Sequence, residues 1–135
     1  PADGQFDPRD VPKFAEAAAG ADIVLGCRTH REPYGFVRRL QSKIYLGLVN
    51  LLFNQRFSDV NWVQMWRVET AGAIELQSTG VFMQQELIDR ARRARMRSVE
   101  APASFRKRAG GLAKGSTAGT VLTTIGEMLK YRFSR

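Results

Sequence analysis

The chain reads Ala21-Asp22-Ile23-Val24-Leu25-Gly26 shortly after a candidate helix. A short apolar run in that position is typical of a strand buried in an α/β sheet. The preceding helix is marked by Asp7 as N-cap and by Pro8 at its first position, and we expect it to stop at Gly20. Residues 27–34 are polar and charged, which predicts a loop after the strand.

Helices and strands alternate along the rest of the chain. Pro102 cannot donate a ladder hydrogen bond, so the strand that contains it is expected at or near a sheet edge. Trp62 and Trp66 are expected on one face of another strand, either in the core or as a platform for a sugar or lipid. This alternation predicts the α/β class. The residue pattern predicts helices at 36–54, 68–77, 81–95 and 121–133, and strands at 61–67 and 97–102.

The helix predicted at residues 36–54 contains a nearly continuous apolar stretch at 44–53. A bilayer-spanning helix needs about 20 apolar residues, so this stretch does not cross a membrane. One interpretation is a helix of the core or of a dimer interface. The other is an amphipathic helix lying in a membrane interface, with Arg38, Arg39 and Lys43 toward the lipid headgroups.

Composition indicates a folded, basic chain. It has 135 residues, the size of one domain, and 44% of them are hydrophobic. The net charge of +8 is concentrated at residues 28–43 and 90–114, and such clusters attract nucleic acid, nucleotides or anionic lipid. The arginines between residues 90 and 97 are interpreted as a solvated helix face. Cys27 and His30 are the only residues of their types, which excludes a disulfide framework and a Cys- or His-rich metal centre.

A carboxylate precedes a glycine near the start of the chain. Asp3-Gly4-Gln5 lies before the first predicted helix. Oxygen donors in such a turn are suited to holding Mg²⁺ or Mn²⁺ against a diphosphate. Most Asp-Gly pairs are simple turns, so this signal is weak alone.

The segment Ala-Asp-Gly-Gln-Phe-Asp-Pro at residues 2–8 resembles the metal-binding segment of family 2 glycosyltransferases. The nearest resemblance within that family is to the dolichol-phosphate mannosyltransferase-like enzymes, which use polyprenyl phosphates. It covers residues 2 to about 130. Further segments resemble the family's motifs in the same order, at residues 21–28, 38–43, 59–61, 86–91, 99–102 and 108–114.

The resemblance implies the C-terminal part of a Rossmann-like GT-A glycosyltransferase domain with an amphipathic interface helix. Residues 1–116 would form the acceptor-side part of the catalytic domain, and residues 117–135 a C-terminal helix with a basic tail. Pro1 stands where the family has the first Asp of its metal motif. We therefore expect a fragment of a larger transferase, inactive by itself, without the half that binds the base and ribose.

The implied activity is that of an inverting, metal-dependent hexosyltransferase. It would move a sugar from a nucleotide-diphosphate sugar to a polyprenyl phosphate, dolichyl or undecaprenyl. Asp3, helped by Gln5, would hold Mg²⁺ or Mn²⁺ at the leaving diphosphate. The residues expected to neutralise phosphate are Arg28 and Arg108, with Arg106 and Lys114 nearby.

The resemblance also implies how the acceptor is bound. Arg38, Arg39 and Ser42 would position a lipid phosphate, which is already anionic and needs no general base. If the acceptor is instead a hydroxyl, a base is required, and Asp59 is the best candidate. Residues 61–66 and Ala113 depart from the family pattern, so the acceptor pocket and the phosphate loop are expected to differ.

The expected setting is the cytoplasmic side of a membrane, with the protein peripheral at the inner face and able to form a homo-oligomer. One alternative is a glycosyltransferase that acts on a glycan or another hydroxyl. A second alternative is a non-catalytic basic module that binds nucleic acid. The chain has neither an RNP-type aromatic motif nor a helix-turn-helix signature, so nucleic acid is not an expected partner.

Overall fold

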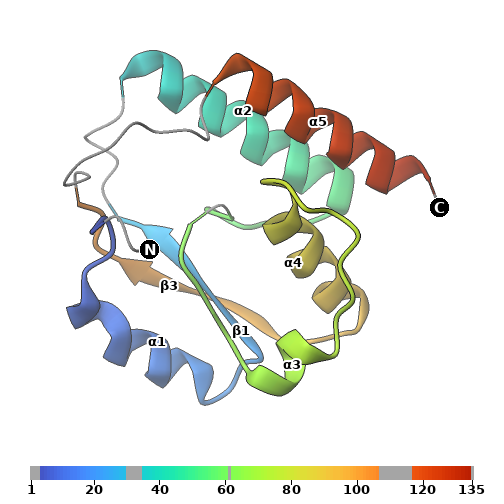
Figure 1. Ribbon diagram of the computed structural model, residues 1–135. Helices are drawn as coiled ribbons and strands as arrows, with labels where there is room; N and C mark the ends of the chain where they lie inside the picture. Colours follow the sequence, from blue (N-terminus) through green and yellow to red (C-terminus); the bar gives the residue numbers. More distant parts are fainter. Residues whose placement is uncertain (1–3, 30–34, 61, 107–116, 135) are drawn as a thin grey trace.

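The computed structural model describes residues 4–29, 35–60, 62–106 and 117–134 (Figure 1). They form a small mixed α/β domain, so the predicted α/β class is confirmed. A short 3₁₀ turn, η1, leads into the first helix. The elements in chain order are η1 (Pro8–Asp10), α1 (Val11–Ala18), β1 (Ile23–Arg28), α2 (Phe36–Phe53), β2 (Gln64–Trp66), α3 (Val68–Gly72), α4 (Met83–Arg93), β3 (Ser98–Ala103) and α5 (Ala118–Phe133).

The sheet has the strand order β2-β1-β3. The central strand β1 runs antiparallel to β2 and parallel to β3. Pro102 lies in β3, which is an edge strand of this sheet, as its missing N–H requires. An isolated antiparallel bridge between Phe6 and Phe105 adds a contact beyond the end of β3.

Alternating side chains of β1 supply two cores. Ile23 and Leu25 are buried against residues of α2, α4 and α5. Val24 points to the other face, where it packs with Phe14 of α1. In Figure 1 the sheet accordingly lies between α1 on one side and α2 with α5 on the other. The apolar residues of the run at 21–26 are therefore buried because both faces of β1 are covered, whereas Asp22 stays half-exposed.

The first helix begins and ends close to the predicted positions. Oδ1 of Asp7 accepts a hydrogen bond from the Arg9 backbone N–H at 3.1 Å, so Asp7 is the predicted cap. The cap opens η1, and α1 follows it and ends at Ala18, two residues before Gly20. Asp10 is buried and accepts from the Ser104 N–H and from Lys13 Nζ, both at 2.6 Å, which ties α1 to the chain after β3.

The long helix α2 matches the predicted span. Asn54 ends it in the left-handed conformation, with φ of 50°. Just before that, Asn50 bonds the Phe57 N–H and C=O with its side chain and anchors the next loop. One face of α2 buries Val49 and Phe53 in the core, while the opposite face exposes apolar side chains. Among the described residues, no helix has the length and apolar character needed to cross a membrane.

Two predicted elements are shorter in the structure. The strand expected at 61–67 is the three-residue β2, and the helix expected at 68–77 is α3, which ends at Gly72. The chain beyond α3 is held instead by Glu86 of α4, whose carboxylate accepts from the Gln77 and Ser78 N–H groups at 2.9 and 2.8 Å. A buried carboxylate thus holds the chain near the position where the helix was predicted to end.

Candidate active site

A buried ion pair joins the end of β1 to the loop after α2. Nε and Nη2 of Arg28 donate to the two carboxylate oxygens of Asp59, at 2.5 and 2.8 Å. The two side chains are only 8% and 4% exposed. Such a two-bond pair fixes the plane of the guanidinium as well as compensating its charge.

Aromatic rings enclose this pair. The guanidinium carbon of Arg28 lies 5.7 Å from the centre of the Trp62 ring and 5.5 Å from that of Phe105. Trp62 and Phe105 also meet edge to face, and Phe6 packs against Trp62. Exclusion of water by these rings strengthens the charge interaction between Arg28 and Asp59.

The prediction that Trp62 and Trp66 share a face is wrong. Trp62 packs in the cluster that contains Val24, whereas Trp66 packs in the cluster that contains Ile23. The strand β2 begins only at Gln64, so Trp62 precedes the regular alternation on which the prediction depended. Trp62 instead forms part of the wall around Arg28.

The first described residues lie against the segment that follows β3. The Arg106 backbone N–H donates to the Gln5 carbonyl at 2.9 Å, next to the bridge between Phe6 and Phe105. Nη2 of Arg106, a half-exposed side chain, donates to the Asp7 carboxylate. The Arg9 N–H, helped by the charges of Arg9 and Arg106, holds the pKa of Asp7 below its ordinary value.

These contacts gather four of the predicted site residues at the carboxyl edge of the sheet. They are Gln5, Arg28, Asp59 and Arg106. In Figure 1 the first turns of α2 begin on the same side of the molecule as the ends of β1 and β3. Arg39 is exposed there and Ser42 is half-buried. Asp3, Arg108, Lys114 and the side chain of Arg38 lie outside the described residues.

The described part of the chain supplies only part of the predicted metal site. It holds no group of three or more His, Cys, Asp or Glu side chains suited to a metal ion. Asp7 is bonded to Arg9 and Arg106, and Gln5 is the predicted ligand that lies within the described residues. Mg²⁺ commonly takes one or two protein oxygens and completes its shell with phosphates and water, which suits Gln5 together with Asp3. The metal site remains a prediction.

The arginines at the end of α4 are not simply a solvated face. Nε of Arg90 donates to Glu86 at 2.7 Å, and Nε of Arg93 donates to Asp89 at 2.6 Å. Arg92 also donates to Asp89, and both carboxylates are fully buried. The hydrogen bond from Asp89 raises the pKa of Arg93. The interpretation as a solvated face is therefore wrong for Arg90, which is partly buried, whereas Arg92 and Arg93 are exposed and also paired within the helix at i,i+3 and i,i+4 spacings.

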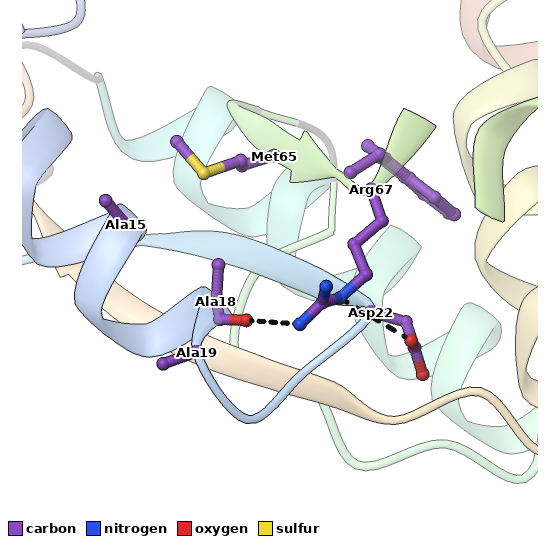
Figure 2. A pocket seen from close by; sticks show the side chains of 7 residues that line it. Ala15, Ala18, Ala19, Asp22, Met65 and Arg67 are labelled. Carbon is purple, nitrogen blue, oxygen red and sulfur yellow. Dashed lines mark hydrogen bonds and ion pairs between the residues drawn. The ribbon is translucent and has the colours of Figure 1, made fainter. Parts of the chain in front are cut away.

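A hollow lies at the opposite end of β1, away from the candidate site. Its volume is about 230 Å³, and small side chains of α1 line it together with Met65 and Trp66. Figure 2 shows Arg67 reaching across it, with Nη2 donating to the Ala18 carbonyl at 3.1 Å and an ion pair to Asp22 at 3.8 Å. Nε of Arg67 donates to the Ala21 carbonyl at 3.0 Å. Arg67 thus closes the end of α1, and no predicted site residue lines this hollow.

No protein-family model matches the chain. A relative among the curated proteins is undecaprenyl-phosphate mannosyltransferase of Micrococcus luteus, 30% identical over 141 aligned positions. The match covers 92% of this chain and 55% of the relative, so the chain spans about half the length of that enzyme. This similarity supports a segment like that of a polyprenyl-phosphate glycosyltransferase.

Proposed function

We propose that this chain is the acceptor-side part of an inverting hexosyltransferase of glycosyltransferase family 2, with the GT-A fold. The reaction would move a sugar from a nucleotide-diphosphate sugar to a polyprenyl phosphate. The observation that carries the proposal is the match to undecaprenyl-phosphate mannosyltransferase along 92% of the chain. The cluster of Arg28, Arg106 and Gln5 at one sheet edge supports it.

The chemistry starts from an acceptor that is already a nucleophile. A phosphate oxygen of the lipid attacks the anomeric carbon from the side opposite the diphosphate. The new C–O bond forms as the bond to the diphosphate breaks, which inverts the configuration, and the nucleotide diphosphate leaves. Arg106, with Arg108 and Lys114, compensates the charge that develops on this leaving group.

The geometry of Asp59 favours a phosphate acceptor over a hydroxyl acceptor. Both of its carboxylate oxygens accept from Arg28, and the side chain is almost fully buried. A general base needs to reach the proton that it removes. Asp59 is better suited to hold Arg28 in place at the sheet edge than to deprotonate an alcohol, and a phosphate acceptor requires no base.

Asp3 and Gln5 are the residues that we assign to a divalent ion, Mg²⁺ or Mn²⁺. When bound, such an ion would act as a Lewis acid on the oxygens of the leaving diphosphate. The bridge from Phe6 to Phe105 keeps Gln5 beside Arg106, so a donor for the ion and a cation for the diphosphate lie next to each other.

The outer face of α2 and α5 is suited to a membrane surface. In Figure 1 the two helices run side by side over the sheet. Both expose apolar side chains, and Arg39 and Lys43 of α2 are exposed near this apolar face. We assign the face to the inner leaflet of a membrane, where α2 would present Arg38, Arg39 and Ser42 to the acceptor phosphate. The exposed large apolar residues of these helices are Phe36, Val37, Leu40, Ile44 and Leu51 of α2 and Leu122, Leu129 and Phe133 of α5.

A transfer assay on the full-length protein tests this function. The protein is incubated in detergent with undecaprenyl phosphate, Mg²⁺ and a panel of radiolabelled nucleotide-diphosphate sugars. We expect a labelled glycolipid that extracts into organic solvent and depends on one of the sugars. A panel of common sugar nucleotides that yields no labelled lipid, with active protein shown by nucleotide binding, would refute the proposal.

A further inference from the structure

We infer that Glu100 is a positioning residue for the candidate active site. It holds the loop that carries Asp59, and Asp59 in turn holds Arg28. This inference rests on the proposed function and adds to it a residue on an edge strand.

The contacts of Glu100 are concentrated on two successive residues. Its Oε1 atom accepts from the Ser58 N–H at 2.6 Å and from the Asp59 N–H at 3.3 Å. Its Oε2 atom accepts from the Ser58 hydroxyl at 3.0 Å. A carboxylate that accepts from neighbouring backbone N–H groups forms charge-assisted bonds, which are stronger than neutral ones. Glu100 therefore fixes the backbone from which the Asp59 side chain projects.

The loop between α2 and β2 depends on such tethers because it has no regular structure at residues 55–60. Asn50 holds it on the helix side through Phe57. On the sheet side the Gly26 N–H donates to the Val63 carbonyl at 2.8 Å, an approach that a side chain at residue 26 would block. Glu100 holds the middle of the loop, immediately before the Asp59 side chain.

The sheet register places Glu100 and Arg28, the first and last residues of this chain of contacts, on neighbouring strands. Glu100 pairs with Leu25 in the parallel ladder of β1 and β3, and Arg28 ends β1 three residues further on. Asp59 thus links β3, through Glu100, to the end of β1, through Arg28. Loss of the Glu100 carboxylate would remove no group assigned to substrate, but it would free the loop that orients Arg28.

Kinetics of the full-length protein can separate this role from simple support of the fold. The variants are Glu100→Ala, Glu100→Gln and Asp59→Asn, with the combination Glu100→Gln/Asp59→Asn. Because small displacements of positioned groups are costly, Glu100→Ala should lower kcat/KM about tenfold to a hundredfold, and Glu100→Gln should lose less. In the double variant, adding Glu100→Gln to Asp59→Asn should lower kcat/KM no further, because Glu100 acts through Asp59.

The exposed Glu75, in the segment after α3, provides the matched control. Glu75→Gln should keep the wild-type kcat/KM. Wild-type activity in Glu100→Ala would overturn the inference. So would multiplicative losses in the double variant, because they would mean that Glu100 acts independently of Asp59.

An NMR measurement decides the geometry without relying on activity. In protein labelled with ¹⁵N-arginine, the Arg28 Nε–H signal is assigned by its disappearance in Arg28→Lys. We expect this proton to exchange with water about tenfold faster in Glu100→Gln, a variant chosen to stay folded, than in the wild type. An unchanged exchange rate would overturn the inference. If the wild type transfers no sugar, the proposed function fails, and the Arg28 signal still shows whether Glu100 holds Asp59 and Arg28 in place.

Discussion

Arg28 donates two hydrogen bonds to Asp59, at 2.5 and 2.8 Å, across a separation of 31 residues in the sequence. The pair joins the last residue of β1 to an irregular loop, and two aromatic rings cover it. The sequence predicts Arg28 in a loop, but the structure holds its cation at the end of β1, on the sheet edge. Its orientation depends on Asp59, and the stability of that region depends on both residues.

Removal of one partner of this pair should destabilise the fold. Asp59→Ala leaves the Arg28 cation buried without its carboxylate, and we expect the free energy of unfolding to fall by about 3–5 kcal/mol. The comparison is Asp22→Asn, which removes the charge of a half-exposed ion pair to Arg67 but keeps a side-chain oxygen for the Arg97 N–H, and it should cost about 1 kcal/mol or less. Urea titration followed by circular dichroism measures both. Equal losses would mean that the buried pair is no stronger than a surface one.

Stability should also depend on acid through Asp10. The Lys13 ammonium and the Ser104 N–H lower the pKa of this carboxyl to about 2. Because the pKa is lower in the folded state than in the unfolded state, this contribution is fully present above about pH 4 and is lost as the pH falls toward 2. Asp10→Asn should lower stability by about 1–2 kcal/mol at pH 6 and make the dependence between pH 4 and pH 2 shallower. Thermal melts across that range test this, and parallel curves for the two proteins would contradict it.

The phosphate and metal roles predict large losses of transfer in the full-length protein. Asp3→Ala should abolish metal-dependent turnover, and Arg108→Ala should lower kcat by about a hundredfold. Arg93 is unsuitable as a neutral control, because it is paired with the buried Asp89. Arg95 is exposed at the end of α4, so Arg95→Gln serves instead and should keep normal activity. A loss in Arg95→Gln as large as that in Arg108→Ala would refute the assigned role.

The membrane assignment predicts binding that depends on both apolar and basic residues. Ile44→Glu/Leu51→Glu should abolish co-sedimentation with anionic liposomes, and Arg39→Gln/Lys43→Gln should weaken it by about 1 kcal/mol per charge. Leu48 and Leu52 are unsuitable targets because they pack against the core. Val68→Glu changes an exposed apolar residue of α3 and should bind like the wild type. Equal sedimentation of all variants would mean that this face does not bind the membrane.

The fold was largely predictable because its signals are local. The strand β1 and the helix α2 were predicted from short apolar runs. The edge position of β3 was predicted from one residue, Pro102. The predicted α3 was too long: the helix ends at Gly72, and Glu86 of α4 holds the chain further on, at Gln77 and Ser78. Element type was therefore readable from sequence, whereas element length depended on tertiary contacts.

The candidate site was less predictable because its contacts join distant segments. Arg28 and Asp59 were singled out separately, but nothing in the sequence indicates that they form a pair. Phe105 was missed as part of the wall around Arg28, although its position beside Arg106 offered a signal. Trp62 was assigned to the wrong face because the alternation of a strand was extended to residues that precede β2.

The central claim is that the acceptor is a lipid phosphate, with Asp59 engaged by Arg28 and no general base required. The most direct measurement compares undecaprenyl phosphate with undecaprenol, its dephosphorylated form, as acceptors for the full-length protein and one nucleotide-diphosphate sugar. We expect labelled glycolipid from the phosphate alone, with the sugar configuration inverted at the anomeric carbon. Transfer to undecaprenol, or to a glycan hydroxyl, at a rate comparable to that for the phosphate would contradict it.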